Sequence, residues 1–431
     1  MNEMTPESIL DIPLKASYDV VSDTYKGSGL DIHQVCEEMR QKTPIYEGDF
    51  IKQFGIPTNA GLAQGTKPTF ALFGYHDVMG ILRDAETYTS SFILKGFGAA
   101  FDGGLFILGM DGEPHRNVRK LLQSAFMPAT VNGWRGKIDR VIREDFLTPM
   151  VAAKKANLME FGLYFPIRLM YSLMGFPESD TAQYNRFASW ALLMAGANQI
   201  DPDKIEDAKK MGALAAQGLY DAILQIVVSR RGEEGQADDL IARLLRAEYD
   251  DGTKLSDHEV VTFVRSLLPA AGETTTRTLS AILTMLFTQP GLLDRVRDDR
   301  ELIPKLIDET IRFEPIATFK VRETSRDVEL HGVHIPKGSF VQAMVVSANR
   351  DESVFENGQK FDIDRVQKPS FGFGFGPHMC IGQFVAKLEL NVALNAMFDL
   401  FPNLRLDPDY PLPEIQGAQL RGTSEVHVLW D

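Results

Sequence analysis

Apolar side chains recur at three- and four-residue spacing along most of this 431-residue chain, which is the pattern of helices that bury one face. Short apolar runs bounded by glycine or proline indicate strands. Helices are predicted over residues 33–41, 76–83, 131–153, 163–174, 179–196, 203–231, 238–249 and from 256 past 286, with others starting at Pro114, ending before Pro315 and following Cys380. Strands are expected at residues 69–73 and within 321–330. The pattern predicts a mainly α chain with small β-sheets.

The helix that starts at Ser256 is the longest of these elements and carries a proline in its middle. Pro269 removes one main-chain donor and pushes against the carbonyl of Arg265, so we expect the helix to open or bend there. A threonine hydroxyl inside a helix can bond to the carbonyl four residues earlier. We therefore expect Thr274 to bond to the carbonyl of Ala270.

Residues 88–110 fit no period, because large apolar side chains are interleaved irregularly with five glycines. A long apolar loop is costly to leave in water and must cover something. It packs either on its own core or as one wall of a hydrophobic pocket.

Composition and charge narrow the classes of protein. The formal net charge of -14 argues against nucleic-acid binding. No Ser/Gly/Pro-rich linker, charge block or repeat divides the chain, so we expect a single domain over residues 1–431. Charged residues interrupt residues 1–25, leaving no signal-peptide core and no membrane span there, and a soluble cytoplasmic protein is expected. Two cysteines, Cys36 and Cys380, are too few to hold an iron–sulfur cluster by four thiolates.

A glycine-rich aromatic loop, FGFGFGPHMCIG at residues 371–382, precedes the last apolar-periodic run. Alternate glycines allow its backbone to lie against a flat surface, and Pro377 fixes a bend before Cys380. At the start of a helix, amide hydrogens and the helix dipole favour a thiolate, the form of cysteine that binds a metal. The alternative is a buried free cysteine in an ordinary loop, which is the commoner fate of a single cysteine.

Two pairs of charged residues share helix faces. His115 and Arg119 are four residues apart after Pro114, and Glu309 and Arg312 are three apart before Pro315. Each pair alone is compatible with an exposed helix surface, where ion pairs contribute little.

Taken together, these motifs resemble the cytochrome P-450 monooxygenases. The defined positions of that family's haem-binding loop are matched by Phe373, Gly374, Gly376, His378, Cys380 and Gly382. The family's Glu-x-x-Arg element matches at Glu309 and Arg312. Its acid–alcohol pair matches at Glu273 and Thr274, with one departure: the Ala-Gly pair ahead of the acid is Ala270-Ala271, and the glycine is displaced to Gly272. The resemblance spans roughly residues 111–382 and implies one large fold with a long distal helix over haem b.

The resemblance implies roles residue by residue. Cys380 is expected to be the axial ligand of the haem iron, and Glu273 and Thr274 to deliver protons as the catalytic pair. Cofactor contacts are assigned to His115, Arg119, Arg322, Phe373, His378, Cys380 and Gly382. A buried network that holds the cysteine loop is assigned to Glu309, Arg312 and Arg365. The substrate pocket is expected to be lined by Phe92, Leu94, Phe97, Phe106, Leu193, Ala270, Ala271, Ile316, Thr318, Phe319 and Gln419.

The implied function is a monooxygenase that inserts one oxygen atom of O2 into a C–H bond of a small hydrophobic substrate. A carboxylate or hydroxyl on that substrate has Lys95, Gln416 and Gln419 as candidate partners. Electrons are expected from NAD(P)H through a separate ferredoxin, or a flavodoxin, and its reductase, docking near Arg116, Lys120 and Lys387. We expect a monomer. A peroxide-driven or non-oxygenating enzyme of the same fold, and a haem sensor without catalysis, are the alternatives.

Overall fold

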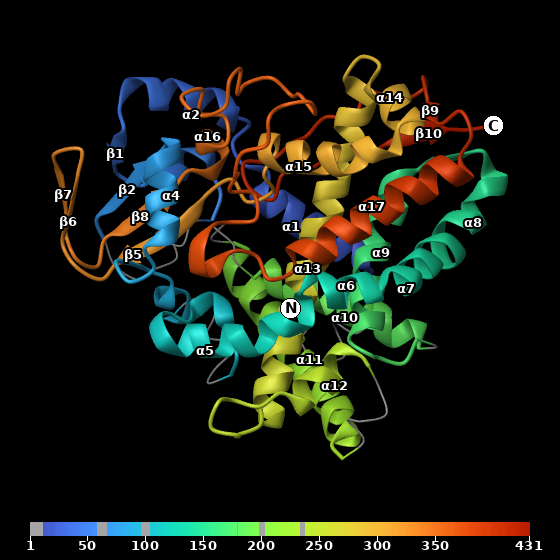
Figure 1. The fold of residues 1–431 in the computed structure, drawn as a ribbon, viewed down its shortest axis with the longest axis horizontal. Coiled ribbons are helices and arrows are strands. Elements are labelled where there is room, and N and C mark those ends of the chain that lie inside the picture. Colours follow the sequence, from blue (N-terminus) through green and yellow to red (C-terminus); the bar gives the residue numbers. More distant parts are fainter. Residues whose placement is uncertain (1–11, 58–66, 96–103, 179, 198–202, 233–237) are drawn as a thin grey trace.

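The computed structural model describes residues 12–57, 67–95, 104–178, 180–197, 203–232 and 238–431 (Figure 1). Helices predominate, as the spacing of apolar residues predicted. The longer helices are α1 (Leu14–Lys26), α2 (Ile32–Lys42), α4 (Tyr75–Arg83), α5 (Gly112–Gln123), α9 (Leu158–Leu173), α10 (Thr181–Ala195), α11 (Ile205–Arg230), α13 (Asp257–Thr288), α15 (Ile303–Phe313) and α17 (Gln383–Leu400). Shorter ones are α6 (Pro128–Gly133), α7 (Arg135–Arg140), α8 (Thr148–Met150), α12 (Leu240–Arg246), α14 (Leu292–Asp298) and α16 (Val345–Ala348).

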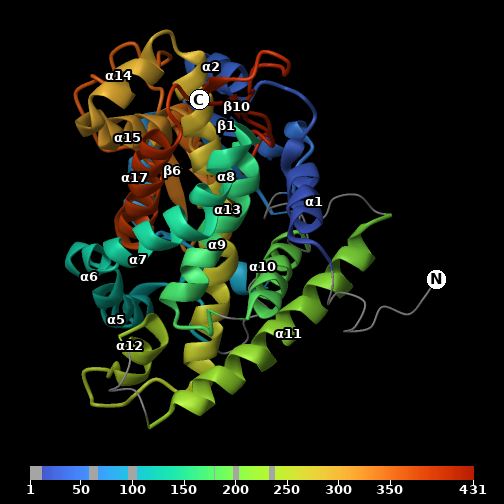
Figure 2. The same cartoon turned by 90° about the vertical axis from the view of Figure 1, so that its right-hand side faces the viewer.

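Helix α13 runs through the middle of the molecule, with α9, α10, α11, α15 and α17 packed around it (Figures 1 and 2). Its first turn is fixed by a capping box, in which the Ser256 hydroxyl accepts from the amide of Glu259 and the Glu259 carboxylate accepts from the amide of Ser256. The helix continues from Asp257 to Thr288 with Pro269 inside it, so the proline does not end the helix. One missing hydrogen bond is a small local loss in a long helix whose packing against its neighbours stabilises it.

A five-stranded sheet lies to one side of this helical body (Figure 1). The strand order is β1 (Ile45–Glu47), β2 (Thr69–Leu72), β8 (Phe340–Ala343), β5 (Lys320–Thr324) and β3 (Tyr88–Thr89). Strand β2 pairs parallel with β8, and the other neighbours are antiparallel. Smaller sheets are formed by β4 (Lys155–Asn157), β10 (His427–Leu429) and β9 (Arg405–Leu406), and by β6 (Val328–Leu330) and β7 (Val333–Ile335).

The hydrophobic core is divided between the helical body and the five-stranded sheet. The largest cluster of buried side chains joins the helices, and two smaller clusters cover the two faces of the five-stranded sheet. The space between α13 and the edge of that sheet is therefore a boundary between packed units, where a pocket can form.

Among the described residues, α11 is the one helix whose length and composition would allow it to cross a membrane, and 33% of its most apolar window is buried inside the protein. A single helix of this kind also occurs in the cores of soluble proteins, so it does not by itself indicate a membrane span.

Candidate active site

The loop that carries Cys380 is held in shape by its own backbone. The amide of Gly374 donates to the carbonyl of Phe371 at 2.8 Å, and the amide of Cys380 donates to the carbonyl of Phe373 at 2.8 Å. Gly376 has φ of +69°, and a Cβ there would lie 2.5 Å from the carbonyl oxygen of Leu82 on α4. A larger residue at Gly376 would therefore strain the backbone and push the loop off α4.

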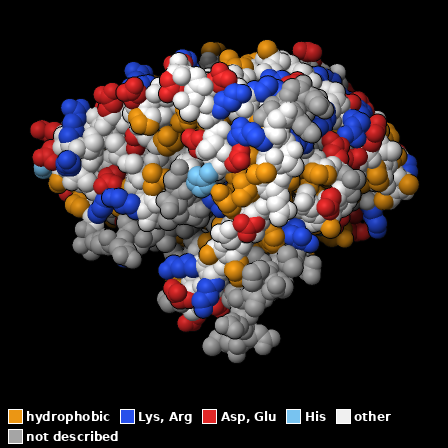
Figure 3. Space-filling view, turned by 90° about the horizontal axis from the view of Figure 1, so that it is seen from below, with side chains coloured by type: hydrophobic (Ala, Val, Ile, Leu, Met, Phe, Trp, Pro, Cys, Tyr) orange, Lys and Arg blue, Asp and Glu red, His pale blue; other side chains and the backbone are white. Residues whose placement is uncertain are grey.

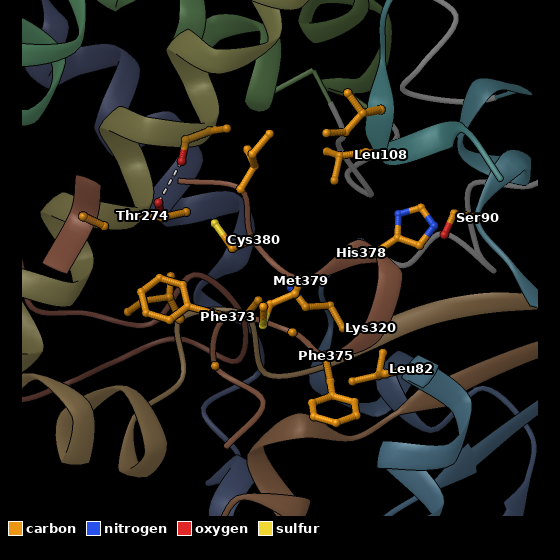
Figure 4. A pocket seen from close by; sticks show the side chains of 18 of the residues that line it. Leu82, Ser90, Leu108, Thr274, Lys320, Phe373, Phe375, His378, Met379 and Cys380 are labelled. Atoms are coloured by element: carbon orange, nitrogen blue, oxygen red, sulfur yellow. Dashed lines mark hydrogen bonds between the residues drawn. The ribbon is translucent and has the colours of Figure 1, made fainter. Parts of the chain in front are cut away.

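The Cys380 sulfur opens into a cavity and is otherwise surrounded by protein (Figure 4). Burial raises the pKa of the Cys380 thiol, while the amides of Gly382 and Gln383 and the charges of Lys320 and Arg119 lower it without cancelling the effect of burial. Helix α17 begins at Gln383, three residues after the cysteine. Burial of the sulfur thus opposes the thiolate, and a cation bound at the sulfur would favour it.

The cavity has a volume of about 490 Å³ and lies between α13, β5 and the cysteine loop. Five of the predicted pocket residues line it: Phe106, Ala270, Ile316, Phe319 and Gln419. The Gln419 side-chain oxygen also accepts the amide of Thr318 at 2.7 Å, which fixes the strand entry beside the cavity.

The other five predicted pocket residues that the structure describes do not line the cavity, for identifiable reasons. Phe92 packs edge-on against Phe340 in the sheet, and Leu193 belongs to α10 and is buried in the core between the helices. Leu94 is 41% exposed, Ala271 lies on another face of α13, and the hydroxyl of Thr318 bonds to the carbonyl of Ala418. Phe97 lies outside the described residues. Sequence spacing located these segments but not the direction of their side chains.

Gln416 and Lys95, which were predicted as possible partners of a substrate carboxylate or hydroxyl, do not line the cavity. Gln416 forms a backbone bridge with Gly422, and Lys95 is exposed on a short 3-10 helix, η3 (Ser91–Lys95).

Basic side chains gather on one side of the cavity. Arg119 from α5 reaches the cysteine loop, where its guanidinium donates to the carbonyl of Met379 at 2.6 Å. Arg322 from β5 also lines the wall, and burial lowers its pKa to about 10. The His115 and His378 rings lie 4.2 Å apart between centroids. Burial, with the nearby charges of His378 and Arg119, lowers the pKa of His115 to about 4, so it is neutral at pH 7.

This set of groups fits the predicted haem. Arg119 and Arg322 form no ion pair with a carboxylate in the described part of the chain, and the buried Nε2 atom of His115 has no hydrogen-bond partner there. Buried donors are ordinarily paired, so this side of the cavity is complementary to carboxylates such as haem propionates. Phe373 and Cys380 line the same cavity and lie toward Thr274, away from His378 (Figure 4).

The acid–alcohol pair is split by the geometry of α13. Thr274 lines the cavity and donates its hydroxyl to the carbonyl of Ala270 at 2.7 Å, as predicted. Glu273 is absent from the cavity wall and is 4% exposed, with its carboxylate 2.6 Å from the Nε atom of Arg277. Arg277 also donates to the hydroxyl of Ser22 on α1 at 2.9 Å. Glu273 is therefore held on the α1 side of the helix, behind Thr274.

The three residues of the predicted network are brought together behind the cysteine loop. Glu309 accepts from Arg312 at 2.6 Å and lies 3.4 Å from the Nε atom of Arg365. Arg312 donates to the carbonyl of Asn349 at 2.7 Å, and the Asn349 side chain accepts the amide of Phe371 at 2.7 Å. The network thus connects α15 to the first residue of the cysteine loop.

Several lining residues were not anticipated from the sequence, namely Thr275 and Thr278 on α13 and Lys320 on β5. Ile93 and Leu108 also line the cavity, as expected if the irregular segment forms one of its walls. Lys320 was detectable, because side chains two residues apart on a strand share a face, and Arg322 was already assigned to the cavity.

A family model described as cytochrome P450 matches residues 181–421. The cyclomarin C epoxidase CymV of Salinispora arenicola is 30% identical over 381 residues, which covers 88% of this chain and 91% of that protein. The mycinamicin IV hydroxylase/epoxidase of Micromonospora griseorubida is 32% identical over 333 residues, covering 76% and 80%. The solved structure of ligand-free cytochrome P450 TbtJ1 matches with a TM-score of 0.78 at 27% identity, covering 93% of this chain and 97% of that one.

Proposed function

Because this chain belongs to the cytochrome P450 family, whose members are monooxygenases that bind haem b through a cysteine thiolate, we propose that it hydroxylates a C–H bond of a small hydrophobic substrate. One oxygen atom of O2 enters the product, the other leaves as water, and NAD(P)H supplies the electron pair. The observation that carries the proposal is a single apolar cavity with Cys380 and Thr274 both in its wall.

The residues of this chain have separate tasks in that reaction. Cys380 is assigned to the iron, and Arg119, Arg322 and His115 to the haem propionates. Phe373, His378 and Gly382 are assigned to contacts between the cysteine loop and the haem. Bound haem supplies the activation of oxygen, which a thiolate ligand favours. The apolar walls hold the substrate and exclude water.

Thr274 is assigned to proton delivery at the oxygen site, because its hydroxyl lies in the cavity wall. Glu273 is assigned to proton supply from behind Thr274. This assignment rests on its position next to Thr274 in the helix, and its ion pair with Arg277 holds the carboxylate on the α1 side.

Thr274→Ala is expected to uncouple NADH oxidation from product formation, lowering product per NADH by about 10-fold or more, since a positioned proton donor contributes about 10²-fold or more. Product and NADH are measured together with a ferredoxin and its reductase. Thr278→Ala is the matched control, because it removes a hydroxyl from the same face of the cavity one turn later. In the native protein, that hydroxyl donates to the carbonyl of Thr274. Equal coupling in the two variants would remove Thr274 from its assigned role.

The same assay separates the alternatives. The proposed enzyme consumes NADH and forms a product that has gained one oxygen atom, and the relatives' names cover both hydroxylation and epoxidation. A haem sensor forms no product from NADH or from hydrogen peroxide. A peroxide-driven enzyme forms product from hydrogen peroxide, but it forms none from NADH and the redox partners.

We further propose that a ferredoxin, or a flavodoxin, docks over α5. Arg116 is exposed on α5, and Arg119, three residues on, contacts the cysteine loop directly. Lys120 is paired with Asp250 at 2.9 Å, and Lys387 with Asp308 at 2.6 Å. On the face seen from below, basic and acidic side chains are interspersed (Figure 3). The proposed basic contact surface is therefore confined to the area around α5, and a small acidic partner would suit it.

Charge reversal at Arg116 and Lys120 is expected to slow reduction of the iron by the partner about 10-fold at low salt, and to flatten its dependence on ionic strength. Stopped-flow reduction measures both. Arg405→Glu, on β9 in the distant three-stranded sheet, is the control for loss of positive charge elsewhere. Unchanged kinetics in the double variant would contradict the docking surface.

The remaining proposals concern the whole chain. We propose a cytoplasmic monomer in which residues 1–431 form one domain. Size-exclusion chromatography with light scattering measures the oligomeric state, and cell fractionation measures the location.

A further inference from the structure

Lys320 lies in the wall of the cavity with its charge unpaired. It is the first residue of β5, and it shares a strand face with Arg322, two residues on. Both side chains line the cavity, and Lys320 lies between Met379 and Phe375 in the close view (Figure 4). Within the described ranges, its ammonium group makes no hydrogen bond or ion pair.

Other partly buried lysines of this chain have acidic partners. Lys67 lies 2.6 Å from Glu323, Lys137 lies 3.1 Å from Glu178, and Lys387 lies 2.6 Å from Asp308. An ammonium group withdrawn from water without an anion is unfavourable. Lys320 therefore departs from the pattern that this protein follows elsewhere.

Among the described residues of the cavity wall, no carboxylate is available to Lys320, and the Cys380 sulfur, which also faces it, is assigned to the iron. Glu314 is the acidic residue of that wall. Its carboxylate is already bonded to Arg350 at 2.7 Å and Arg421 at 3.0 Å, and it lies 3.0 Å from His33. Three positive side chains, Arg119, Lys320 and Arg322, thus face a cavity whose acid is committed to other cations.

We propose that Lys320 is a carboxylate-binding residue of this cavity, and this inference rests on the proposed haem-dependent function. The carboxylate belongs either to a long-chain acid substrate or to a haem propionate. The neighbouring wall residues Ile316 and Phe319 suit the alkyl part of an acid, whereas the neighbouring Arg322 suits a propionate. An ammonium ion in an enclosed site attracts either carboxylate strongly.

The test compares Lys320→Met with wild type in two measurements on the haem-loaded protein. Spectral titrations with dodecanoic acid and dodecan-1-ol measure whether an acid is bound in preference to an alcohol of the same length. Transfer of haem to apomyoglobin measures how tightly the protein holds its cofactor. Lys320→Arg keeps the charge, and Lys337→Met removes one lysine charge from the exposed turn after β7.

If the carboxylate belongs to the substrate, wild type prefers the acid, and Lys320→Met weakens binding of the acid about 10-fold while binding of the alcohol changes less than about twofold. If it belongs to haem, Lys320→Met accelerates haem transfer about 10-fold and leaves the acid-to-alcohol ratio unchanged. Lys320→Arg restores the affected quantity in either case, and Lys337→Met behaves as wild type.

The proposal is overturned if Lys320→Met transfers haem at the wild-type rate and also binds the acid and the alcohol as wild type does. The carbon-monoxide spectrum of each protein reports independently on the proposed function. A thiolate-type spectrum with unchanged haem transfer and unchanged titrations therefore rejects the role of Lys320 alone, whereas its absence in wild type rejects the haem-thiolate assignment.

Discussion

Cys380→Ser is expected to abolish both the thiolate-type carbon-monoxide spectrum and the monooxygenase activity. The sulfur is the soft, electron-donating group at the base of the cavity, and a serine hydroxyl is a far weaker electron donor to iron. Burial raises the pKa of the Cys380 thiol, and a cation bound at the sulfur would oppose that effect. The measurement is the carbon-monoxide difference spectrum of the reduced protein, with haem content determined in parallel.

Cys36→Ser is the matched control, because Cys36 is the other free cysteine and is buried on α2 in a cluster beside the sheet. Burying a hydroxyl there costs about 1–3 kcal/mol of stability, but the spectrum is expected to stay thiolate-type. A thiolate-type spectrum in Cys380→Ser, or its loss in Cys36→Ser protein that still holds haem, would contradict the assignment of Cys380.

Arg312→Met is expected to destabilise the protein by about 3–5 kcal/mol, because it leaves the buried Glu309 carboxylate without its closest cation. The substitution also removes donors from the carbonyls of Asn349 and Gly358, which lie between α15 and the cysteine loop. Urea unfolding followed by circular dichroism measures the loss of stability. Haem release is expected at lower urea than in wild type, since the loop loses its support.

Arg295→Met is the matched control. Arg295 forms an exposed ion pair with Asp364 at 2.7 Å, and such pairs are screened by water and salt. Its unfolding midpoint is expected to stay near that of wild type. Similar midpoints for Arg312→Met and Arg295→Met would show that the buried network does not support the fold.

The sequence was most informative where chemistry and local backbone geometry coincide. Cys380 was recognised because glycines, a proline and a cysteine occur at fixed spacing, and each of these residues acts on its own stretch of chain. The bond from Thr274 to the carbonyl of Ala270 was predictable for the same reason, since both groups belong to one helix turn.

The direction of individual side chains was harder to predict from the sequence. Phe92 and Leu94 were expected in the pocket because their segment is apolar, yet Phe92 packs into the sheet and Leu94 is largely exposed. Glu273 was grouped with Thr274, but adjacent helix positions point about 100° apart, and Arg277 holds the acid on the α1 side. Lys320 was overlooked because its significance depends on an unpaired charge, which a sequence does not show.

The amino-acid sequence alone determined the helical class, the cysteine loop and the order of the charged motifs, because these depend on residue type and on contacts within a few positions. The tertiary structure decided which side chains share the cavity, which acid faces α1, and which lysine lacks a partner. Those outcomes depend on packing between segments far apart in the chain, such as β5 against the loop at residues 371–382, and no local spacing specifies that packing.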